Sequence, residues 1–330
     1  MSLNSAKTIR WGIIGCGAVT EVKSGPAYQQ IEGFELYAVM RRDVEKLKDY
    51  ADRHHVEKYY TNADELIGDK EVDAIYIATP PDSHMYYALK VAKSGKPCCI
   101  EKPIATNYKD SLAIYKAFKE KSIPLFVAYY RRSLPRFLKI KEWLVNNSIG
   151  EVRHINWMLS RKTKEIDTLK KKNWRTDASI AYGGYFDDLA SHGLDLFTFL
   201  LGDIKEVHGV STNQQNLYTA KDAITGCWLH DCGATGSGTW NFGASFYEDK
   251  VEIIGSKGKV QFSVFGEVSL SLKTEEEEIE VFIENPKHIQ IYHVQNMKKQ
   301  FSDKNYKHPS NGKTATHTAW VMDKILGRLV

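Results

Sequence analysis

Three side chains in this 330-residue chain have types and positions that suit proton transfer, namely Lys102, Asp188 and His192. Lys102 stands in a Glu-Lys-Pro tripeptide that ends the short apolar run 97–100. Such a run is typical of a buried parallel strand, and open α/β sheets hold their ligands at the carboxyl ends of such strands. The proline restricts the backbone where the chain leaves the sheet, so we expect the lysine ammonium to be aimed at a ligand there.

Asp188 and His192 are four residues apart in the stretch 181–195, which opens a predicted helix. On a helix these two side chains share one face with Asp195, and an apolar stripe lies opposite. A carboxylate one turn from an imidazole fixes the imidazole's tautomer and raises its basicity, which suits a general base. A capping aspartate beside a half-buried structural histidine is the alternative interpretation, and the pattern alone leaves it open.

The elements that would position Lys102 form a repeating pattern over residues 8–127, where short apolar runs alternate with amphipathic stretches. Strands that alternate with helices of ten or more residues are typical of parallel βαβ units. Residues 1–128 are therefore predicted to form a Rossmann domain, a doubly wound parallel sheet that binds a dinucleotide. The predicted strands are 8–14, 35–40, 74–78, 97–100 and 125–128. One predicted helix begins near residue 18, and the others span 44–54, 85–93 and 108–121.

After residue 130 the pattern changes to period-two segments separated by turn residues, which is typical of an antiparallel sheet. Residues 129–330 are predicted to form a substrate-binding α+β domain on a large open, mainly antiparallel sheet with helices on one face. We expect copies of the chain to associate across the other face of this sheet, which would give a homodimer or homotetramer. The predicted helices are 137–146, 186–201 and a terminal helix at 313–326, and the predicted strands are 152–159, 223–229, 234–242, 250–254, 259–264, 268–273 and 279–283.

A glycine turn follows the first predicted strand. Gly15 suits a tight turn, and Gly17 would let the backbone approach a pyrophosphate where Ala18 opens a helix. The third small position of the dinucleotide-binding pattern is Thr20, which departs from that pattern. The turn's place at the first strand–helix junction of a doubly wound sheet nevertheless predicts dinucleotide binding.

The end of the second predicted strand bears on the choice of nucleotide. An NAD site usually has an acidic residue there for the ribose hydroxyl, whereas this strand ends in Arg41 and Arg42. Two guanidinium groups can grip a 2′-phosphate, so NADP is favoured over NAD. Asp43 comes one position later, at the predicted N-cap of the next helix. Two solvated arginines at a helix start are the alternative.

The composition is that of a globular protein and argues against nucleic-acid and membrane partners. The net charge is +4, hydrophobic residues make up 42% of the chain, and no 18-residue apolar run is present. The first five residues lack the apolar segment of a signal peptide, so we expect a cytoplasmic protein with reduced thiols. The spacing of Cys227 and Cys232 is unlike that of a zinc site, and no metal is predicted.

Together these motifs resemble the glucose–fructose oxidoreductase/inositol dehydrogenase/MocA (Gfo/Idh/MocA) family of nicotinamide-dependent oxidoreductases, over nearly the whole chain. The resemblance implies a Rossmann domain, a second domain with a large open sheet, and sugar, cyclitol or other polyol substrates. The matching motifs are Gly15-x-Gly17, Thr79-Pro80-Pro81-x-x-His84, Glu101-Lys102-Pro103, Arg131-Arg132-x-x-Pro135, Asn173-Trp174-Arg175 and Asp188-x-x-x-His192-x-x-Asp195, the last preceded by two glycines.

The resemblance also implies roles for individual residues. Lys102 corresponds to the family's catalytic lysine, and Asp188 with His192 to its acid/base pair. Two tyrosines, Tyr182 and Tyr185, depart from the family's small residues and could narrow or reshape the substrate space. The predicted cofactor-binding residues are Gly15, Gly17, Ala18, Arg41, Arg42, Thr79, Pro80, His84, Glu101 and Lys102, and the predicted substrate-lining residues are Tyr130, Arg131, Trp174, Arg175 and Tyr185.

The hypothesis is reversible hydride transfer between a nicotinamide and a secondary alcohol carbon. His192 is the preferred base, Lys102 stabilises charge on the same oxygen, and Asp188 orients His192. An arginine such as Arg175 near the site is compatible with a carboxylate or phosphate on the substrate, and equally with a salt bridge inside the protein. Two alternatives stay open: a nucleotide-binding regulator without turnover, and a redox-neutral glycosidase or lyase that uses transient oxidation.

Overall fold

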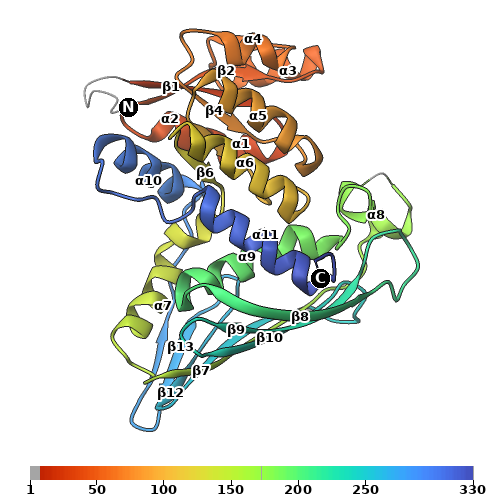
Figure 1. Ribbon diagram of the computed structural model, residues 1–330, viewed down its shortest axis with the longest axis vertical. Coiled ribbons are helices and arrows are strands. Elements are labelled where there is room, and N and C mark those ends of the chain that lie inside the picture. The colour runs from red at the N-terminus through yellow and green to blue at the C-terminus, as the bar shows by residue number, and fades with distance from the viewer. Residues whose placement is uncertain (1–7, 172, 330) are drawn as a thin grey trace. The chain divides into compact units, whose positions relative to one another are not determined.

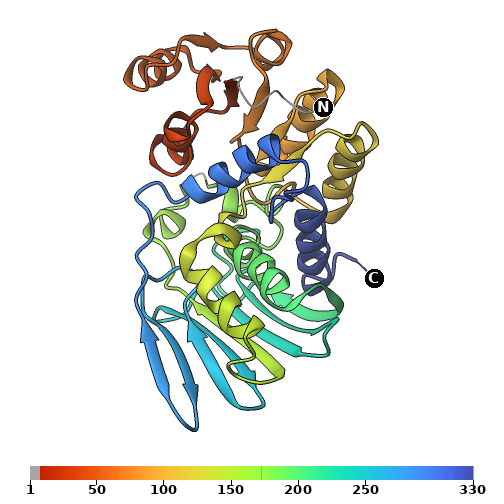
Figure 2. The same ribbon diagram turned by 90° about the vertical axis from the view of Figure 1, so that its left-hand side faces the viewer.

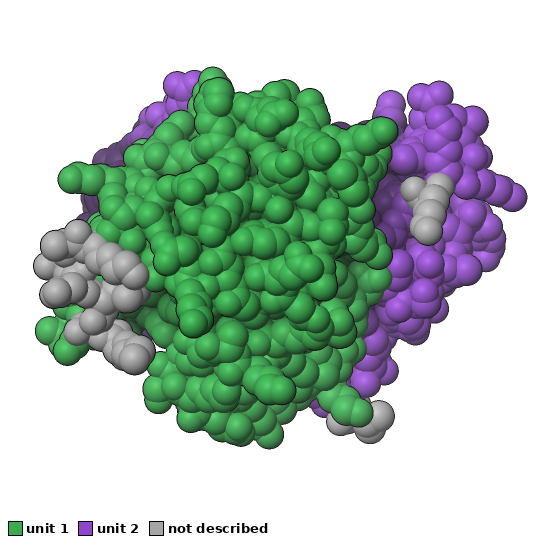
Figure 3. Space-filling model, turned by 90° about the horizontal axis from the view of Figure 1, so that it is seen from above, with its two compact units in different colours: residues 1–133, 286–316 green, residues 134–285, 317–330 purple. Residues whose placement is uncertain are grey.

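The computed structural model describes residues 8–171 and 173–329 (Figure 1). Contacts between residues divide the chain into two compact units, coloured separately in Figure 3. Unit 1 contains residues 1–133 and 286–316, and unit 2 contains residues 134–285 and 317–330. No helix among the described residues is long and apolar enough to cross a membrane.

Unit 1 is built on a parallel sheet, as predicted, which has six strands where the sequence analysis gave five. Its central strands β4 and β5 are buried and apolar along their whole length because helices cover both faces of the sheet. The sequence analysis missed β3 (Lys58–Tyr60), in which no residue is buried and Tyr59 is exposed. In spatial order the strands are β3 (Lys58–Tyr60), β2 (Phe34–Met40), β1 (Ile9–Ile14), β4 (Ala74–Ile77), β5 (Cys98–Ile100) and β6 (Leu125–Val127).

Two apolar clusters cover the two faces of this sheet. Cys98 belongs to one cluster and Cys99 to the other, so the two thiols lie on opposite faces of the sheet. Helices α4 (Ala63–Gly68), α5 (His84–Ser94) and α6 (Tyr108–Glu120) contribute to the first cluster, while α2 (Gly25–Gln30) and α3 (Val44–Arg53) contribute to the second. A short helix, α1 (Ala18–Val22), follows β1.

The segment 286–316 returns to unit 1, whereas the sequence analysis had assigned it to the second domain. Its helix α10 (Ile291–Ser302) buries Val294 and Met297 in the same cluster as Trp11. The ring of Phe301 packs 5.6 Å from that of Phe126 on β6. The predicted single boundary at residue 128 therefore differs from the observed division, because one apolar face of the parallel sheet is covered by chain that follows the second sheet.

Unit 2 contains an eight-stranded sheet in which only β7 and β10 pair in parallel. The other pairs are antiparallel, which confirms the predicted open, mainly antiparallel sheet. In spatial order its strands are β14 (Glu278–Val281), β13 (Leu270–Thr274), β12 (Gly258–Phe262), β11 (Glu248–Gly255), β7 (Val152–Ser160), β10 (Thr235–Asn241), β9 (Ala223–His230) and β8 (Ile204–Thr212).

Helices cover one face of this sheet, as predicted. Figures 1 and 2 show α7 (Pro135–Val145) and α9 (Tyr185–Leu201) on the same side. Nearly all of α9 is buried, and its Phe197 ring meets Trp157 of the sheet edge to face at 5.5 Å. Gly193 lies directly against the Trp157 ring, where a Cβ would overlap it. Unit 2 also holds α8 (Glu165–Thr168) and the end of α11 (Gly312–Ile325), the predicted terminal helix.

Candidate active site

The glycine turn of unit 1 has the backbone geometry that a close-approaching ligand needs. Gly15 adopts a positive φ of 92°, and its N–H donates to the Met40 carbonyl at 2.9 Å. A Cβ on Gly15 would lie 2.6 Å from the Thr79 side chain, so only glycine fits there. Beside Gly17, by contrast, the space is open: the one atom within 4 Å of its Cβ position is the Gly15 oxygen, at 4.0 Å.

Thr20, the departure from the dinucleotide-binding pattern, has a structural role. Its hydroxyl accepts the Gly17 N–H at 3.0 Å and donates to the Gly17 carbonyl at 2.9 Å, which closes the first turn of α1. The buried Tyr50 hydroxyl donates to the Thr20 carbonyl at 3.1 Å. The threonine therefore stabilises the turn internally and leaves the outer side of Gly17 uncovered.

Two basic residues, Arg41 and Arg42, directly follow the end of β2. The Arg41 guanidinium donates to the Cys16 carbonyl at 3.0 Å and so folds back onto the glycine turn, while Arg42 is exposed. Asp43 caps α3, because its carboxylate accepts the Lys46 backbone N–H at 3.2 Å and pairs with the Lys46 ammonium at 3.0 Å. These bonds hold the pKa of Asp43 below its usual value, the hydrogen bond from the Lys46 side chain first. Asp43 is therefore engaged at the start of a helix.

His84 links two loops at the carboxyl edge of the parallel sheet. The residue is completely buried, and its ring nitrogens lie 2.8 Å from the Thr79 carbonyl and 2.9 Å from the Pro103 carbonyl. Burial lowers the pKa of His84, while the two carbonyl contacts act in the opposite direction. The ring thus joins the loop after β4, which carries Thr79 and Pro80, to the loop that carries Lys102. Whether His84 also touches a nucleotide stays a prediction.

Glu101 holds the loop that carries Lys102. It is 7% exposed, and one carboxylate oxygen accepts from the Tyr76 hydroxyl at 2.6 Å and from the Gln290 amide at 2.7 Å. The other oxygen accepts the Lys102 backbone N–H at 3.1 Å. The Lys102–Pro103 peptide bond is cis. Sequence reasoning missed Gln290, because it lies 189 residues from Glu101 in the returning segment.

In unit 2, the start of α9 buries both members of the predicted acid/base pair. Asp188 is 8% exposed and His192 is 5% exposed. The Asp188 carboxylate accepts from the Arg175 Nε at 2.5 Å, and the His192 ring is nearly perpendicular to the Phe265 ring, with the two centroids 5.9 Å apart. Gly184 adopts a positive φ of 64° just before the helix, which permits the sharp entry of the chain. Phe265 has no local motif, and sequence reasoning missed it.

The predicted substrate-lining residues divide between the two units. Tyr130 and Arg131 belong to unit 1, where both are buried and the guanidinium lies 5.0 Å over the tyrosine ring. In unit 2, the Arg175 guanidinium lies 4.4 Å over the Trp174 ring. The Tyr185 hydroxyl donates to Asp167 at 2.8 Å and accepts from the Asn173 amide at 2.8 Å, and burial raises the pKa of Tyr185. Its hydroxyl therefore ties the loop before α9 to the helix.

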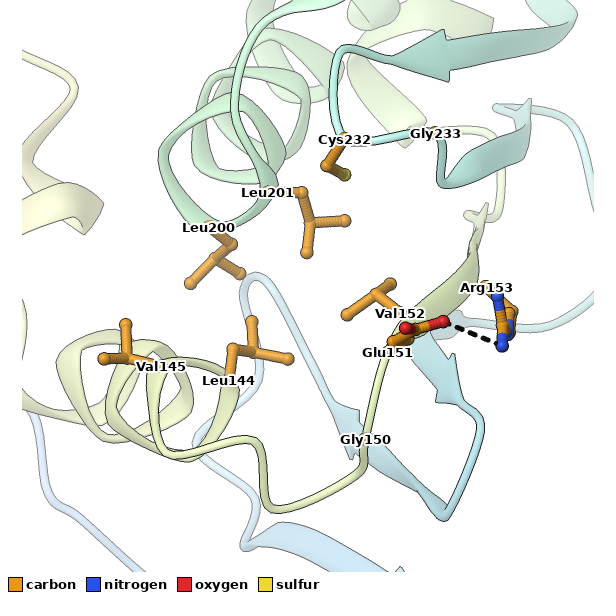
Figure 4. A pocket seen from close by; sticks show the side chains of 10 residues that line it. All are labelled: Leu144, Val145, Gly150, Glu151, Val152, Arg153, Leu200, Leu201, Cys232 and Gly233. Atoms are coloured by element: carbon orange, nitrogen blue, oxygen red, sulfur yellow. Dashed lines mark ion pairs between the residues drawn. The ribbon is translucent and has the colours of Figure 1, made fainter.

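A pocket of about 630 Å³ lies at the opposite end of α9, away from Asp188 and His192 (Figure 4). Figure 4 shows that its one charged pair, between Glu151 and Arg153, is closed on itself at 2.9 Å. No residue predicted to act in catalysis or binding lines it. The lining residues are Leu144, Val145, Gly150, Glu151, Val152, Arg153, Leu200, Leu201, Cys232 and Gly233.

Comparison with known proteins identifies relatives of both units. Residues 9–129 match the model of the oxidoreductase family with an NAD-binding Rossmann fold, and residues 137–261 match the model of the GFO/IDH/MocA C-terminal domain. Oxidoreductase P35 of Formosa agariphila is 38% identical over 97% of this chain and 98% of its own. Myo-inositol 2-dehydrogenase of Thermotoga maritima is 26% identical over 76% of this chain and 74% of its own.

A solved structure has the same fold. Levoglucosan dehydrogenase in complex with NADH superposes with a TM-score of 0.85 and 22% sequence identity, covering 96% of this chain and 95% of that protein. At this identity the likeness establishes the architecture of the two sheets.

Proposed function

This chain belongs to the Gfo/Idh/MocA family of NAD-binding oxidoreductases, and we propose that it transfers hydride between a nicotinamide cofactor and a secondary alcohol or ketone of a sugar, cyclitol or related polyol. The buried carboxylate of Glu101, which fixes the backbone of Lys102 at the carboxyl edge of the parallel sheet, is the observation that supports this most strongly. The buried pair Asp188 and His192 supplies the complementary acid/base chemistry. Relatives named for inositol and levoglucosan agree with polyol substrates.

The residues around the glycine turn fit a dinucleotide, and we propose NADP as the preferred one. Open space beside Gly17 would admit a pyrophosphate against the backbone. Arg41 is anchored next to this turn and Arg42 is exposed, so both offer donors to a 2′-phosphate. Asp43 is engaged as a helix cap and in an ion pair, which disfavours it as the acceptor for a ribose hydroxyl. Two solved structures with this fold hold NAD⁺ or NADH, so this preference would distinguish the chain from those two, while another is named an NADPH-dependent oxidoreductase.

The mechanism assigns one task to each residue. The cofactor, when bound, accepts or supplies the hydride. His192 takes the hydroxyl proton in the oxidation and returns it in the reduction, while the Lys102 ammonium donates a hydrogen bond to the same oxygen and stabilises its developing charge. Asp188, held by Arg175, orients His192. The proposal therefore requires Lys102 and His192 to reach one substrate oxygen during turnover.

Replacement of Lys102 by alanine tests this function. Loss of a charge-stabilising donor is expected to lower kcat by a factor of about 100 to 1,000, while the Kd for NADP stays within a few-fold of the wild-type value. Lys93→Ala is the matched control, since Lys93 is an exposed lysine near the end of α5. Steady-state kinetics and nucleotide titration provide the two readouts. A Lys102→Ala variant with near-normal turnover would exclude this lysine from the chemistry.

Self-association through unit 2 also stays a proposal. On the face of the sheet opposite α9, Met158 and Ile254 are exposed to 41% and 43%. The polar side chains around them pair with one another, for example His154 with Thr235 and Ser237. A broad face of paired polar groups with exposed apolar side chains among them suits a contact between two copies of the chain.

A further inference from the structure

Three cationic side chains gather near the start of α9 in unit 2. Arg161 directly follows β7, Lys164 precedes α8, and Arg175 lies in the short helix Trp174–Thr176. The pKa of Lys164 lies below its usual value because of partial burial, and because the charges of Arg175 and Arg161 disfavour another cation beside them. The three groups are therefore close enough to repel one another.

The carboxylates of this region are already engaged. Asp188 pairs with Arg175 at 2.5 Å, and Asp167 accepts from the Tyr185 hydroxyl at 2.8 Å and from an amide at 3.1 Å. Within residues 8–171 and 173–329, no carboxylate lies within ion-pair distance of Arg161 or Lys164. The charges of Asp188 and Asp167 favour the exposed Lys164 ammonium without forming an ion pair with it, whereas the like charges of Arg175 and Arg161 disfavour it.

Arg161 is held in place before any ligand arrives. Its backbone N–H donates to the Asn241 carbonyl at 2.8 Å, and its guanidinium lies 5.5 Å from the centre of the Tyr247 ring and 5.2 Å from that of Phe265. Its Nε is buried and has no hydrogen-bond partner. The Lys164 ammonium similarly lies 4.4 Å over the Tyr185 ring. Aromatic faces orient cations without neutralising them, so both side chains keep donors for an external anion.

Phe265 connects this cationic pair to the acid/base pair. The same ring that lies beside the Arg161 guanidinium meets His192 at 5.9 Å. Its backbone N–H donates to Asp249 at 2.6 Å, and the other oxygen of that carboxylate accepts from Trp157 at 2.9 Å, so the backbone at Phe265 is tied to the sheet. Arg161 and the proposed base His192 therefore both lie beside the Phe265 ring.

We propose that the polyol substrate carries an anionic oxygen group, a carboxylate or a phosphate, which Arg161 and Lys164 bind while His192 acts on a hydroxyl of the same molecule. This inference rests on the proposed hydride transfer and narrows the substrate class to sugar acids or sugar phosphates. A neutral sugar cannot pair with the two cations, whereas a carboxylate or phosphate accepts several charge-assisted hydrogen bonds from them.

The test compares matched substrates, each sugar or cyclitol being offered as the neutral compound, the corresponding acid and the phosphate. The wild-type enzyme is expected to favour one anionic form at least tenfold in kcat/KM, and the better form tells carboxylate from phosphate. Arg161→Gln and Lys164→Gln should each lower kcat/KM for that form about tenfold or more, mainly through KM. Lys162→Gln, an exposed lysine between them, is the control and should change little.

The outcomes separate this inference from the proposed function. Turnover of neutral polyols as fast as of their acids and phosphates would overturn the anion site and leave the proposed function standing. Equal losses on neutral and anionic substrates in both variants would also overturn it. If nothing in the panel is turned over, the proposed function fails, and thermal shifts decide the anion site. The anion site is supported if glucuronate or glucose phosphate raises the melting temperature of the wild-type protein more than glucose does, and if Arg161→Gln loses this difference. Equal rises in melting temperature with all three compounds would reject the anion site.

Discussion

Asp187 offers a quantitative test of the structure at the entrance to α9. Its carboxylate is 4% exposed, accepts the Gly183 N–H at 2.9 Å and lies 3.6 Å from the Arg328 guanidinium. Burial raises the pKa of Asp187 from 3.8 to about 6, although the arginine and the backbone bond act against the rise. Replacement by asparagine removes the titration and keeps a carbonyl oxygen for Gly183.

The sign and size of the effect follow from the shift. The folded-state pKa of Asp187 is the higher one, so its contribution is fully present below the unfolded-state pKa near 3.8 and is lost as the pH rises to about 6. A rise of roughly two units corresponds to about 3 kcal/mol of unfolding free energy. The Asp187→Asn variant has no carboxylate to titrate at this position, so its unfolding free energy does not fall by this amount. Relative to wild type, the variant should therefore gain up to about 3 kcal/mol between about pH 4 and pH 7.

Denaturant unfolding followed by tryptophan fluorescence across this pH range measures the difference. Glu284→Gln is the matched control, because Glu284 is an exposed carboxylate of the same unit, and its variant should track the wild type. If Asp187→Asn and wild type keep a constant difference in unfolding free energy at every pH, the carboxylate is not neutralised by burial and the reasoning is refuted.

Two further substitutions test the cofactor and the assembly. Arg41→Ala combined with Arg42→Ala should raise the Kd for NADP at least tenfold while barely changing that for NAD, measured by titration with Lys48→Ala as control; equal losses for both nucleotides would refute the phosphate clamp. Met158→Glu places a charge on the outer face of the unit 2 sheet and should lower the molar mass measured by light scattering, whereas an unchanged mass would locate any self-association elsewhere.

The fold was predictable because the hydrophobic residues of each unit recur with a simple period along the sequence. Buried runs such as β4 and β5 and the alternation along β7 indicate their strand types without any knowledge of contacts. The returning segment 286–316 makes its contacts in unit 1, whereas the sequence analysis placed it with the second domain. Its helix α10 is recognisable only through packing against Trp11 and Phe126, and periodicity carries no information about which sheet a helix covers.

The candidate site likewise contains residues that local sequence patterns predict and residues that only the folded chain brings to the site. Lys102, Asp188 and His192 stand in compact local motifs, so their neighbours in sequence are also their structural supports. Gln290 and Phe265 act on these motifs from far along the chain and have no local pattern. Arg161 had an available signal, since it is a cation at the end of a strand as Arg41 is, but its aromatic neighbours come from separate loops.

Tyr185 shows how an expectation changes when contacts are known. As a departure from the small residues of the resembling family, it suggested a narrowed substrate space. Its hydroxyl is bonded to Asp167 and Asn173, and its ring lies under the Lys164 ammonium, while its role beside the substrate stays a prediction. The tyrosine therefore organises the cationic loop, and any effect on the substrate is expected to act through Lys164.

The most direct test of the central claim is the formation of reduced nicotinamide when the purified protein is mixed with NADP and a library of sugars, cyclitols, sugar acids and sugar phosphates. We predict continuous turnover with at least one member, dependent on added NADP and abolished in His192→Asn and Lys102→Ala. Tight NADP binding with no reduction by any member, and no oxidation of NADPH by the corresponding ketones, would contradict hydride transfer and indicate a nucleotide-binding regulator.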